Sequence, residues 1–370
     1  MIFPSIYNKP ILIVGNGVRT AGASDYVYKF ARKTNIPVLT TMNGVDLVQD
    51  DLHIGFIGTH GNRIANMVLD ECDLIISVGA RLGIRQVGRY TCNFAPKAKL
   101  IRVDIDEYEL SRNIKEDEIK YHTDAKSFME MLMSENLSDY SAWKEKVLRA
   151  KELLADYDKQ EGNSCVEKIG SLLPVDPVVA IDVGMHQCWC AQSLVLKGQK
   201  GRILISGGYG TMGCALPFAI GASIARNKSV TYCIVGDGGL QMNIQELETI
   251  IREKLPIKIF VLNNRVLGKI SETQHFNHND RYANTTCDSG YSVPDFQRIA
   301  EAYGMTAFTL ESYHMLNKYK NYIEDNHPYL FNIMLSEESR LTPKIKWETS
   351  LISPQLDKQT EFEVRRILSE

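Results

Sequence analysis

The stretch GDGGLQMNIQELETIIREKLPIKIFVLNN, residues 236–264, decides the fold of this chain. The apolar run before it, 231–235, is rich in β-branched and aromatic residues and predicts a buried strand that ends in a glycine turn. Residues 257–262 predict a second buried strand, and a right-handed crossover makes the two strands parallel. The carboxyl ends of both strands then lie at one edge of a sheet, with Asp237 beside Asn264.

The segment between these two strands has the pattern of a helix. Asn243 and Glu246 stand three residues apart and resemble an N-cap and its capping box. Apolar residues follow at helical spacing as far as Ile251, and Pro256 ends the pattern. We therefore expect a helix of about three turns between the strands.

The two strand ends carry the groups that a hard cation and a phosphate prefer. Magnesium takes oxygen ligands, which the Asp237 carboxylate, the Asn264 amide and a nearby backbone carbonyl can supply. Gly238 and Gly239 leave backbone N–H groups open to phosphate oxygens near the start of a helix. The alternative is a strand–helix–strand unit whose acidic turn only caps its helix.

The same stretch resembles the thiamine diphosphate motif, in which GDG is followed after some two dozen residues by NN. The interval from Asp237 to Asn264 is 27 residues, as in the acetolactate synthase branch of that family. The resemblance implies that Asp237 and Asn264 are side-chain ligands of Mg²⁺ and that Val266 offers its backbone carbonyl. It also places Gly236, Gly238 and Gly239 against the cofactor.

Residues 206–217, SGGYGTMGCALP, resemble a second segment of this family, SGGxGTMGxxLP. The resemblance implies that the Gly210 carbonyl and the Met212 backbone face the aminopyrimidine ring. It further implies that the Met212 side chain holds the cofactor in a bent shape. A methionine in a glycine-rich segment is otherwise most often a core residue.

Residues 182–187, DVGMHQ, resemble the loop of the family that lies on the diphosphate side. Gly184, Met185 and His186 take the phosphate-facing positions, and Met185 stands where a glutamine is usual. An isolated histidine is otherwise most often a structural residue.

Residues 267–274, LGKISETQ, resemble the family segment QGMVxQWQ, and we count Ile270 among the cofactor-binding residues. Lys269 replaces a methionine near the cofactor, and Thr273 replaces the tryptophan that favours a larger acceptor in acetolactate synthases. Two interpretations of Lys269 stay open. Its ammonium suits an anionic or sugar-like substrate, or it is a surface lysine.

The first part of the chain alternates strand and helix signals, with apolar runs at 11–14, 38–39, 74–78 and 100–103. This is a doubly wound α/β pattern. Gly15 and Gly17 follow the first run, but Thr20 stands where a dinucleotide fingerprint has its third glycine.

This part resembles the central domain of the same family, which binds FAD in acetolactate synthases and other nucleotides or nothing in relatives. The matching nucleotide-facing positions are Gly15, Gly17, 41–44, 58–61, Arg81 and Arg85. Both acidic residues of the family's RFDDR segment are missing from Arg81-Leu-Gly-Ile-Arg85. Asp104 and Asp124 could meet a ribose or adenine, or could serve in turns and helix caps. FAD is therefore a possible cofactor rather than an expected one.

These segments predict the fold class and the domain organisation. We expect an α/β protein with two doubly wound parallel-sheet domains. We expect a central domain over 1–138, a helical linker over 139–164, a diphosphate-binding domain over 165–338 and a tail over 339–370. The length of 370 residues agrees with about two globular domains.

Composition excludes several other classes of function. The formal net charge is −3, and no basic patch indicates nucleic acid. No apolar stretch approaches the roughly 20 residues that cross a bilayer, so we expect no membrane partner. The first residues lack the features of a signal peptide, and the 8 cysteines are too few for a disulfide scaffold, so we expect a cytoplasmic protein with reduced thiols.

The resemblance implies a thiamine diphosphate- and Mg²⁺-dependent carboligase or decarboxylase of 2-oxo acids, a transferase or lyase similar to acetolactate synthase. Such enzymes need a glutamate from an amino-terminal pyrimidine-binding domain, which we expect from a missing segment or a separate subunit. Because the active site of this family lies between subunits, a homo-oligomer is expected. The alternative is a non-catalytic cofactor- or nucleotide-binding module.

Overall fold

A computed structural model describes residues 6–135, 138–346, 348–352 and 356–370. The chain forms two compact units. The first unit contains residues 1–159 together with 342–370, and the second contains residues 160–341. Each unit is built on a six-stranded parallel sheet, which confirms the predicted fold class of two doubly wound α/β domains.

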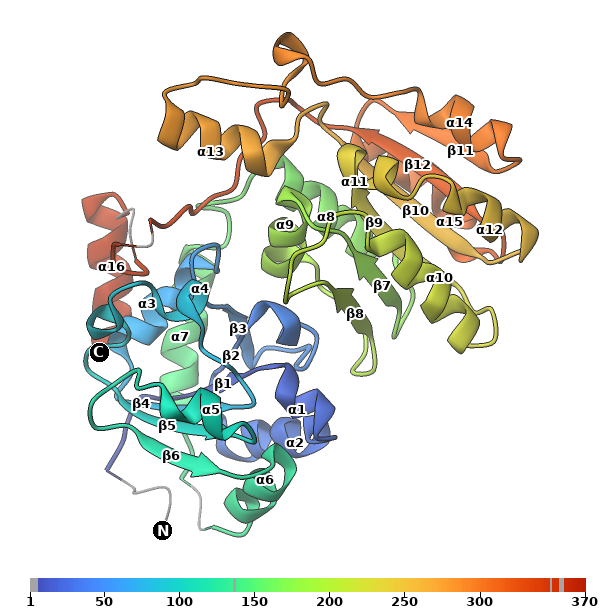
Figure 1. Ribbon diagram of the computed structural model, residues 1–370. Coiled ribbons are helices and arrows are strands. Elements are labelled where there is room, and N and C mark those ends of the chain that lie inside the picture. The colour runs from blue at the N-terminus through green and yellow to red at the C-terminus, as the bar shows by residue number, and fades with distance from the viewer. Residues whose placement is uncertain (1–5, 136–137, 347, 353–355) are drawn as a thin grey trace. The chain divides into compact units, whose positions relative to one another are not determined.

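The sheet of the first unit has the strand order β3-β2-β1-β4-β5-β6 (Figure 1). Its strands are β1 (Pro10–Val14), β2 (Val38–Thr40), β3 (His53–Phe56), β4 (Leu74–Val78), β5 (Lys99–Asp104) and β6 (Ile119–His122). The order runs outward in one direction from β1 and in the other from β4. The point where the winding reverses, between β1 and β4, is where ligands of doubly wound sheets bind.

Helices cover both faces of this sheet. They are α1 (Asn16–Thr20), α2 (Ser24–Thr34), η1 (Met42–Gly44), α3 (Arg63–Glu71), α4 (Ile84–Val87), η2 (Thr91–Asn93), α5 (Glu107–Ser111), α6 (Ala125–Met133), α7 (Ser141–Leu153) and α16 (Lys358–Ser369). In one group α2 packs on α6, and in another α3, α7 and α16 pack together (Figure 1). The helix α7 therefore belongs to the first unit, although its charged sequence suggested a linker.

The C-terminal helix α16 completes the core of the first unit. Val364, Ile367 and Leu368 are buried in the same apolar cluster as the strands. The Arg365 guanidinium lies 3.1 Å from a carboxylate oxygen of Asp70 and 2.9 Å from one of Glu71, both near the end of α3. Residues 342–370, most of the predicted tail, thus belong to the first unit.

The sheet of the second unit has the order β11-β12-β10-β9-β7-β8 (Figure 1). Its strands are β7 (Val178–Ile181), β8 (Arg202–Ile205), β9 (Thr231–Gly236), β10 (Ile257–Asn263), β11 (Thr306–Leu310) and β12 (Tyr329–Met334). Here the winding reverses between β7 and β9. The strands β9 and β10 are adjacent and parallel, with Gly236 opposite Leu262, as the sequence predicted.

Two groups of helices flank this sheet. The helices α8 (Glu161–Leu172) and α9 (Met185–Ser193) pack together. Side chains of α10 (Ala215–Ala225), α11 (Asp237–Met242), α12 (Glu246–Arg252) and α14 (Phe296–Ala302) share one apolar core cluster. The remaining elements are α13 (Gly268–His278), η3 (Cys287–Ser289), η4 (Tyr313–Tyr319) and α15 (Lys320–Glu324).

The predicted capping box at Asn243 is wrong. A short helix, α11, already begins at Asp237, and Asn243 follows its last residue. The residue that caps α12 is Gln245, which makes no side-chain cap bond. The Asn243 amide instead donates a hydrogen bond of 2.8 Å to the carbonyl of Gly213. A local pattern suggested a cap, but a tertiary partner 30 residues away takes the side chain.

Within the described ranges, every helix is too short or too polar to cross a bilayer.

Candidate functional site

A partly open cavity lies at the carboxyl ends of β7, β9 and β10, beside the point where the sheet of the second unit reverses its winding. Its lining comes from the segments 183–189, 236–239 and 262–270, together with Met212. The predicted site residues that line it are Gly184, Met185, His186, Met212, Gly236, Asp237, Gly238, Gly239, Asn264, Val266 and Ile270. Gly210 is not among the lining residues.

Asp237 is the one acidic residue among the described residues that line the cavity. Its Oδ1 accepts hydrogen bonds from the Gly238 amide at 2.6 Å and the Tyr291 hydroxyl at 3.1 Å. Its Oδ2 accepts one from the Arg265 amide at 2.8 Å. Burial raises the pKa of Asp237 to about 6, although these hydrogen bonds work in the opposite direction. A cation would relieve the cost of burying this charge.

Asn264 and Val266 lie on the adjacent strand end and line the same cavity as Asp237. Among the described residues, the Asn264 Oδ1 accepts a single long hydrogen bond, of 3.4 Å from the Val266 amide. The Val266 carbonyl accepts one of 2.8 Å from Gly268, and a carbonyl oxygen has a second lone pair. One carboxylate and two neutral oxygens are a suitable protein share for Mg²⁺, which keeps water or phosphate oxygens in its other positions.

No cluster of three or more His, Cys, Asp or Glu side chains suitable for a metal occurs in the part of the chain that the structure describes. A cation at Asp237 would therefore depend on neutral oxygens and on oxygens of a bound ligand. The donor set fits a hard cation that arrives with a diphosphate and does not fit a soft metal such as zinc.

His186 carries the clearest mark of a missing ligand. Only 5% of the residue is exposed, and its Nε2 has no hydrogen-bond partner within the described structure. Burial lowers the pKa of His186 to about 4, with nearby Asp182 opposing the shift, so the ring is neutral at pH 7. Because buried polar atoms nearly always have partners, an unpaired nitrogen in the cavity wall indicates a polar ligand.

The glycines of the lining keep the cavity open. A Cβ on Gly236 would lie 3.0 Å from the ring of His186, and one on Gly238 would lie 2.6 Å from Leu267. A Cβ on Gly184 would lie 2.7 Å from the His186 Nδ1. These glycines allow the backbone and His186 to surround the space closely, as a phosphate cradle requires.

Asp182 fixes the loop that carries Gly210 and Met212. It is fully buried, and its two carboxylate oxygens accept from the Gly213 amide at 2.9 Å and the Ala215 amide at 3.4 Å. Gly210 has a left-handed backbone with φ of 66° and is exposed. This role of Asp182 could not be predicted from local sequence, because its partners lie about 30 residues away.

Two further residues at the site were not predicted from the sequence. Tyr291 contacts Asp237 from a loop 54 residues further along the chain. Trp189 lines the cavity and donates from its indole N–H to the Arg340 carbonyl at 3.1 Å. Neither residue stands in a recognisable motif, so only tertiary structure brings them to the site.

At the edge of the first unit where a nucleotide was expected, two glycines pack closely against backbone. A Cβ on Gly15 would lie 2.6 Å from the Ala80 Cα, and one on Gly17 would lie 2.7 Å from the Gly79 Cα. Both glycines therefore serve close packing of backbone at the reversal between β1 and β4. The Thr59 amide likewise donates to the Arg85 carbonyl at 2.9 Å.

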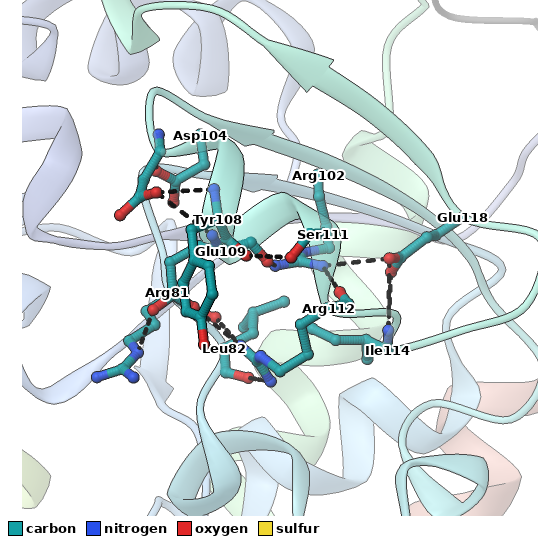
Figure 2. Close-up of polar contacts among 11 residues, drawn as sticks. Arg81, Leu82, Arg102, Asp104, Tyr108, Glu109, Ser111, Arg112, Ile114 and Glu118 are labelled. Atoms are coloured by element: carbon teal, nitrogen blue, oxygen red, sulfur yellow. Dashed lines mark hydrogen bonds and ion pairs between the residues drawn. The ribbon is translucent and has the colours of Figure 1, made fainter.

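Figure 2 shows that Arg81 and its neighbours are bonded within the chain. Arg81 lies 2.7 Å from a carboxylate oxygen of Glu109. Arg112 donates to the carbonyls of Leu82 at 3.0 Å and Arg81 at 2.6 Å, which ties the segment after β4 to the end of α5 (Figure 2). Asp104 accepts from the Asp106 amide at 3.0 Å.

Asp124 caps α6 by accepting from the Lys126 and Ser127 amides. The turn and capping roles thus account for both aspartates, and Glu109 accounts for Arg81, without a nucleotide. The contacts of these three residues therefore give no support for an FAD site.

Comparisons with known proteins agree with the geometry of both units. A family model described as "Thiamine pyrophosphate enzyme, central domain" matches residues 6–132. A second, described as "Thiamine pyrophosphate enzyme, C-terminal TPP binding domain", matches residues 182–333 and so includes the cavity.

Similar proteins are named as acetolactate synthase large subunits. The probable acetolactate synthase large subunit of Methanocaldococcus jannaschii is 33% identical over 369 residues, covering 94% of this chain and 61% of the relative. The large subunit of isozyme 2 from Escherichia coli K12 is 32% identical, covering 91% and 62%. The large subunit from Lactococcus lactis is 32% identical, covering 92% and 60%. The chain thus spans about three fifths of the length of these relatives.

Proposed function

This chain belongs to the thiamine pyrophosphate enzymes, whose central domain and C-terminal cofactor-binding domain it contains, and from that premise we propose that it acts on 2-oxo acids as a thiamine diphosphate- and Mg²⁺-dependent carboligase or decarboxylase similar to acetolactate synthase. One observation carries the proposal. A buried carboxylate, Asp237, and a buried nitrogen without a hydrogen-bond partner, His186 Nε2, both line the same cavity.

The residues of the cavity would divide the work as follows. Asp237, the Asn264 amide and the Val266 carbonyl would hold Mg²⁺. His186 and the backbone amides of the glycine turn after β9 would hold the diphosphate. Thiamine diphosphate, when bound, supplies a nucleophilic carbon for the carbonyl of a 2-oxo acid and accepts the electrons released with carbon dioxide.

Orientation is the main contribution of the protein. The Met212 side chain reaches the glycine turn, since its Cε lies 3.6 Å from the position of a Cβ on Gly238. Asp182 holds the loop of Met212 through the Gly213 and Ala215 amides. A fixed loop keeps a bound ring in one orientation, which lowers the entropic part of the barrier.

A partner surface is part of this proposal. The helix α10 has the sequence ALPFAIGASIA, without a charged residue, yet Phe218 and Ile224 are exposed on it. Helices that are apolar all round are normally buried, so this face is suited to a partner. The helix begins directly after the Met212 loop. We propose that a pyrimidine-binding domain, from another segment of a longer protein or from a separate subunit, covers this face and brings the glutamate that the cavity does not contain.

Calorimetry with thiamine diphosphate and Mg²⁺ tests the cofactor role. We expect saturable binding to the chain and a loss of at least about 100-fold in the Asp237→Ala variant, beyond the range of outer-shell substitutions. Asp280→Ala is the matched control, because Asp280 is an exposed carboxylate in the same unit. Equal binding by the Asp237→Ala and wild-type proteins contradicts the proposal.

Turnover distinguishes an enzyme from a binding module. We expect no conversion of pyruvate by the 370-residue chain alone and conversion when a pyrimidine-binding domain is added. Cofactor binding without turnover in every such mixture favours the non-catalytic alternative.

A further inference from the structure

The loop 284–291 braces the turn that carries the proposed metal ligands. The Thr285 carbonyl accepts a hydrogen bond of 2.9 Å from the Leu267 amide. The Thr285 hydroxyl donates to Gln274 on α13 at 2.6 Å. The loop is therefore attached both to the turn after Asn264 and to the helix that follows it.

The loop is itself tightly organised. The Ser289 hydroxyl oxygen accepts from the amides of Thr285 at 3.0 Å and Thr286 at 2.9 Å, and Thr286 and Ser289 form a capping box. Gly290 has φ of 103°, a left-handed conformation that favours glycine. The Tyr291 amide then donates to the Thr286 carbonyl at 3.0 Å. Tyr291 thus leaves the loop in one fixed direction.

The Tyr291 hydroxyl meets Asp237 in a way that distinguishes its two oxygens. Oδ1 accepts from Tyr291 at 3.1 Å and from the Gly238 amide at 2.6 Å. Oδ2 accepts from the Arg265 amide at 2.8 Å. A carboxylate oxygen has two lone pairs, so these two donors occupy Oδ1, whereas Oδ2 has one close donor, the Arg265 amide, and is the oxygen more open to a cation.

We propose that Tyr291 is a positioning residue that makes Asp237 a one-oxygen ligand and thereby favours Mg²⁺ over Ca²⁺. Mg²⁺ requires a compact octahedral shell with one oxygen from each carboxylate, whereas Ca²⁺ accepts carboxylates through one oxygen or two. Blocking Oδ1 removes the two-oxygen mode that suits the larger ion. The inference depends on the proposed cofactor role of Asp237.

The test measures thiamine diphosphate binding to the full chain by calorimetry, once with Mg²⁺ and once with Ca²⁺. In the wild-type protein we expect tighter binding with Mg²⁺. In Tyr291→Phe we expect the affinity with Mg²⁺ to fall about 10-fold to 100-fold, the usual range for an outer-shell residue. The affinity with Ca²⁺ should fall less, because the freed Oδ1 can now bind that ion, so the ratio of the two affinities shifts by about 10-fold.

Tyr282→Phe is the matched control. The Tyr282 hydroxyl also donates to a carboxylate, Asp280, at 2.7 Å, but this pair is exposed and outside the cavity lining. Its removal should leave both affinities unchanged. Thermal melting without metal checks that both variants are folded.

The outcomes separate this inference from the proposed function. No metal-dependent binding by the wild-type protein refutes the cofactor role of Asp237. Binding by the wild-type protein with an unchanged affinity ratio in Tyr291→Phe overturns the inference alone, whether both affinities fall together or neither falls. If Tyr291→Phe does not fold, Tyr291→His, which keeps a donor, takes its place; a retained Mg²⁺ preference supports the inference, and a lost preference in the folded protein overturns it.

Discussion

The two units use glycine differently at the same topological position. In the first unit, Gly15 lies where the winding reverses between β1 and β4, and a Cβ there would meet backbone at Ala80, 2.6 Å away. In the second unit, Gly184 follows β7 at the reversal next to β9, and a Cβ there would meet the ring of His186. The glycine at the reversal point therefore serves backbone packing in the first unit and makes room for the His186 ring in the second.

The charged groups show the same contrast. At the reversal of the first unit, Arg81 is paired with Glu109 at 2.7 Å. In the second unit, burial raises the pKa of Asp237 to about 6, and the nearby His186 has an unpaired Nε2. Arg81 of the first edge thus has a partner within the chain, whereas the second edge holds unfavourable burial that a cation and an anion together would relieve.

Gly15→Ala should give the largest effect and would test the structural side of this comparison. Gly15 has φ of −114°, which any residue can adopt, so the cost comes only from the clash of a new methyl with backbone. Overpacking against atoms that cannot move costs about 1–3 kcal/mol, occasionally more. We expect a loss of about 3 kcal/mol in urea unfolding. Thiamine diphosphate affinity in the second unit should stay within error of the wild-type value.

Gly184→Ala is the matched substitution in the second unit. Its φ of 168° is extended, and the new methyl would meet a side chain that can rotate away. We expect a loss of about 1–2 kcal/mol, smaller than that of Gly15→Ala, because the new methyl meets a side chain rather than backbone. Displacement of His186 should weaken thiamine diphosphate binding about 10-fold to 100-fold, the range seen for supporting residues. A loss of cofactor affinity in Gly15→Ala together with a larger loss of stability in Gly184→Ala would contradict the proposed difference between the two units.

Much of this contrast could be predicted from local sequence, and the reasons are physical. The strands β4, β9 and β10 are mostly apolar runs, interrupted by Ser77 in β4 and Lys258 in β10, which is close to the pattern of strands buried on both faces of a parallel sheet. Asp237 and Asn264 directly follow two of these runs. Because adjacent parallel strands end at one edge, local pattern and register were enough to bring them to one cavity.

The features that failed prediction depend on distant partners. Asn243 has the local pattern of an N-cap but bonds to Gly213. The role of Asp182 depends on amides about 30 residues away, and that of Tyr291 on a carboxylate 54 residues away. The helix α16 packs in the core of the first unit, close to α3, almost 300 residues earlier in the chain. No local periodicity encodes such contacts.

Lowering the pH should change the stability of the two units differently, by less than Gly15→Ala does. Burial lowers the pKa of His53 in the first unit to about 3. In the unfolded chain the pKa of His53 is about 6.5, so between pH 3 and pH 6.5 the unfolded state binds more protons than the folded state. The contribution of His53 to the free energy of unfolding is therefore complete above pH 6.5 and is lost as the pH decreases toward 3. Because part of His53 is exposed, we expect a loss of about 1–2 kcal/mol between pH 6.5 and pH 4.

The measurement is urea unfolding across this pH range, with and without thiamine diphosphate and Mg²⁺. A His53→Gln variant should show a flatter slope. The lowered pKa of His186, about 4, gives the second unit a dependence of the same sign. A phosphate beside the His186 ring would favour its protonated form. The ligand should therefore reduce the contribution of His186 to the pH dependence of stability and leave the contribution of His53 unchanged. If the ligand changed the contributions of His53 and His186 equally, the proposed difference between the first and second units would be contradicted.

The smallest expected effect is that of FAD, which should leave stability unchanged. A ligand at 100 times its Kd raises the free energy of unfolding by about 2.7 kcal/mol, which thermal melting resolves easily. We expect such a rise with thiamine diphosphate and Mg²⁺ and none with FAD, because Arg81, Asp104 and Asp124 already have partners within the chain. Gel filtration should separate the protein from added flavin. A yellow protein with one flavin per chain would mean that the first edge opens to ligand despite these contacts, and the contrast with the second unit would then lie in the cost of opening rather than in the presence of a site.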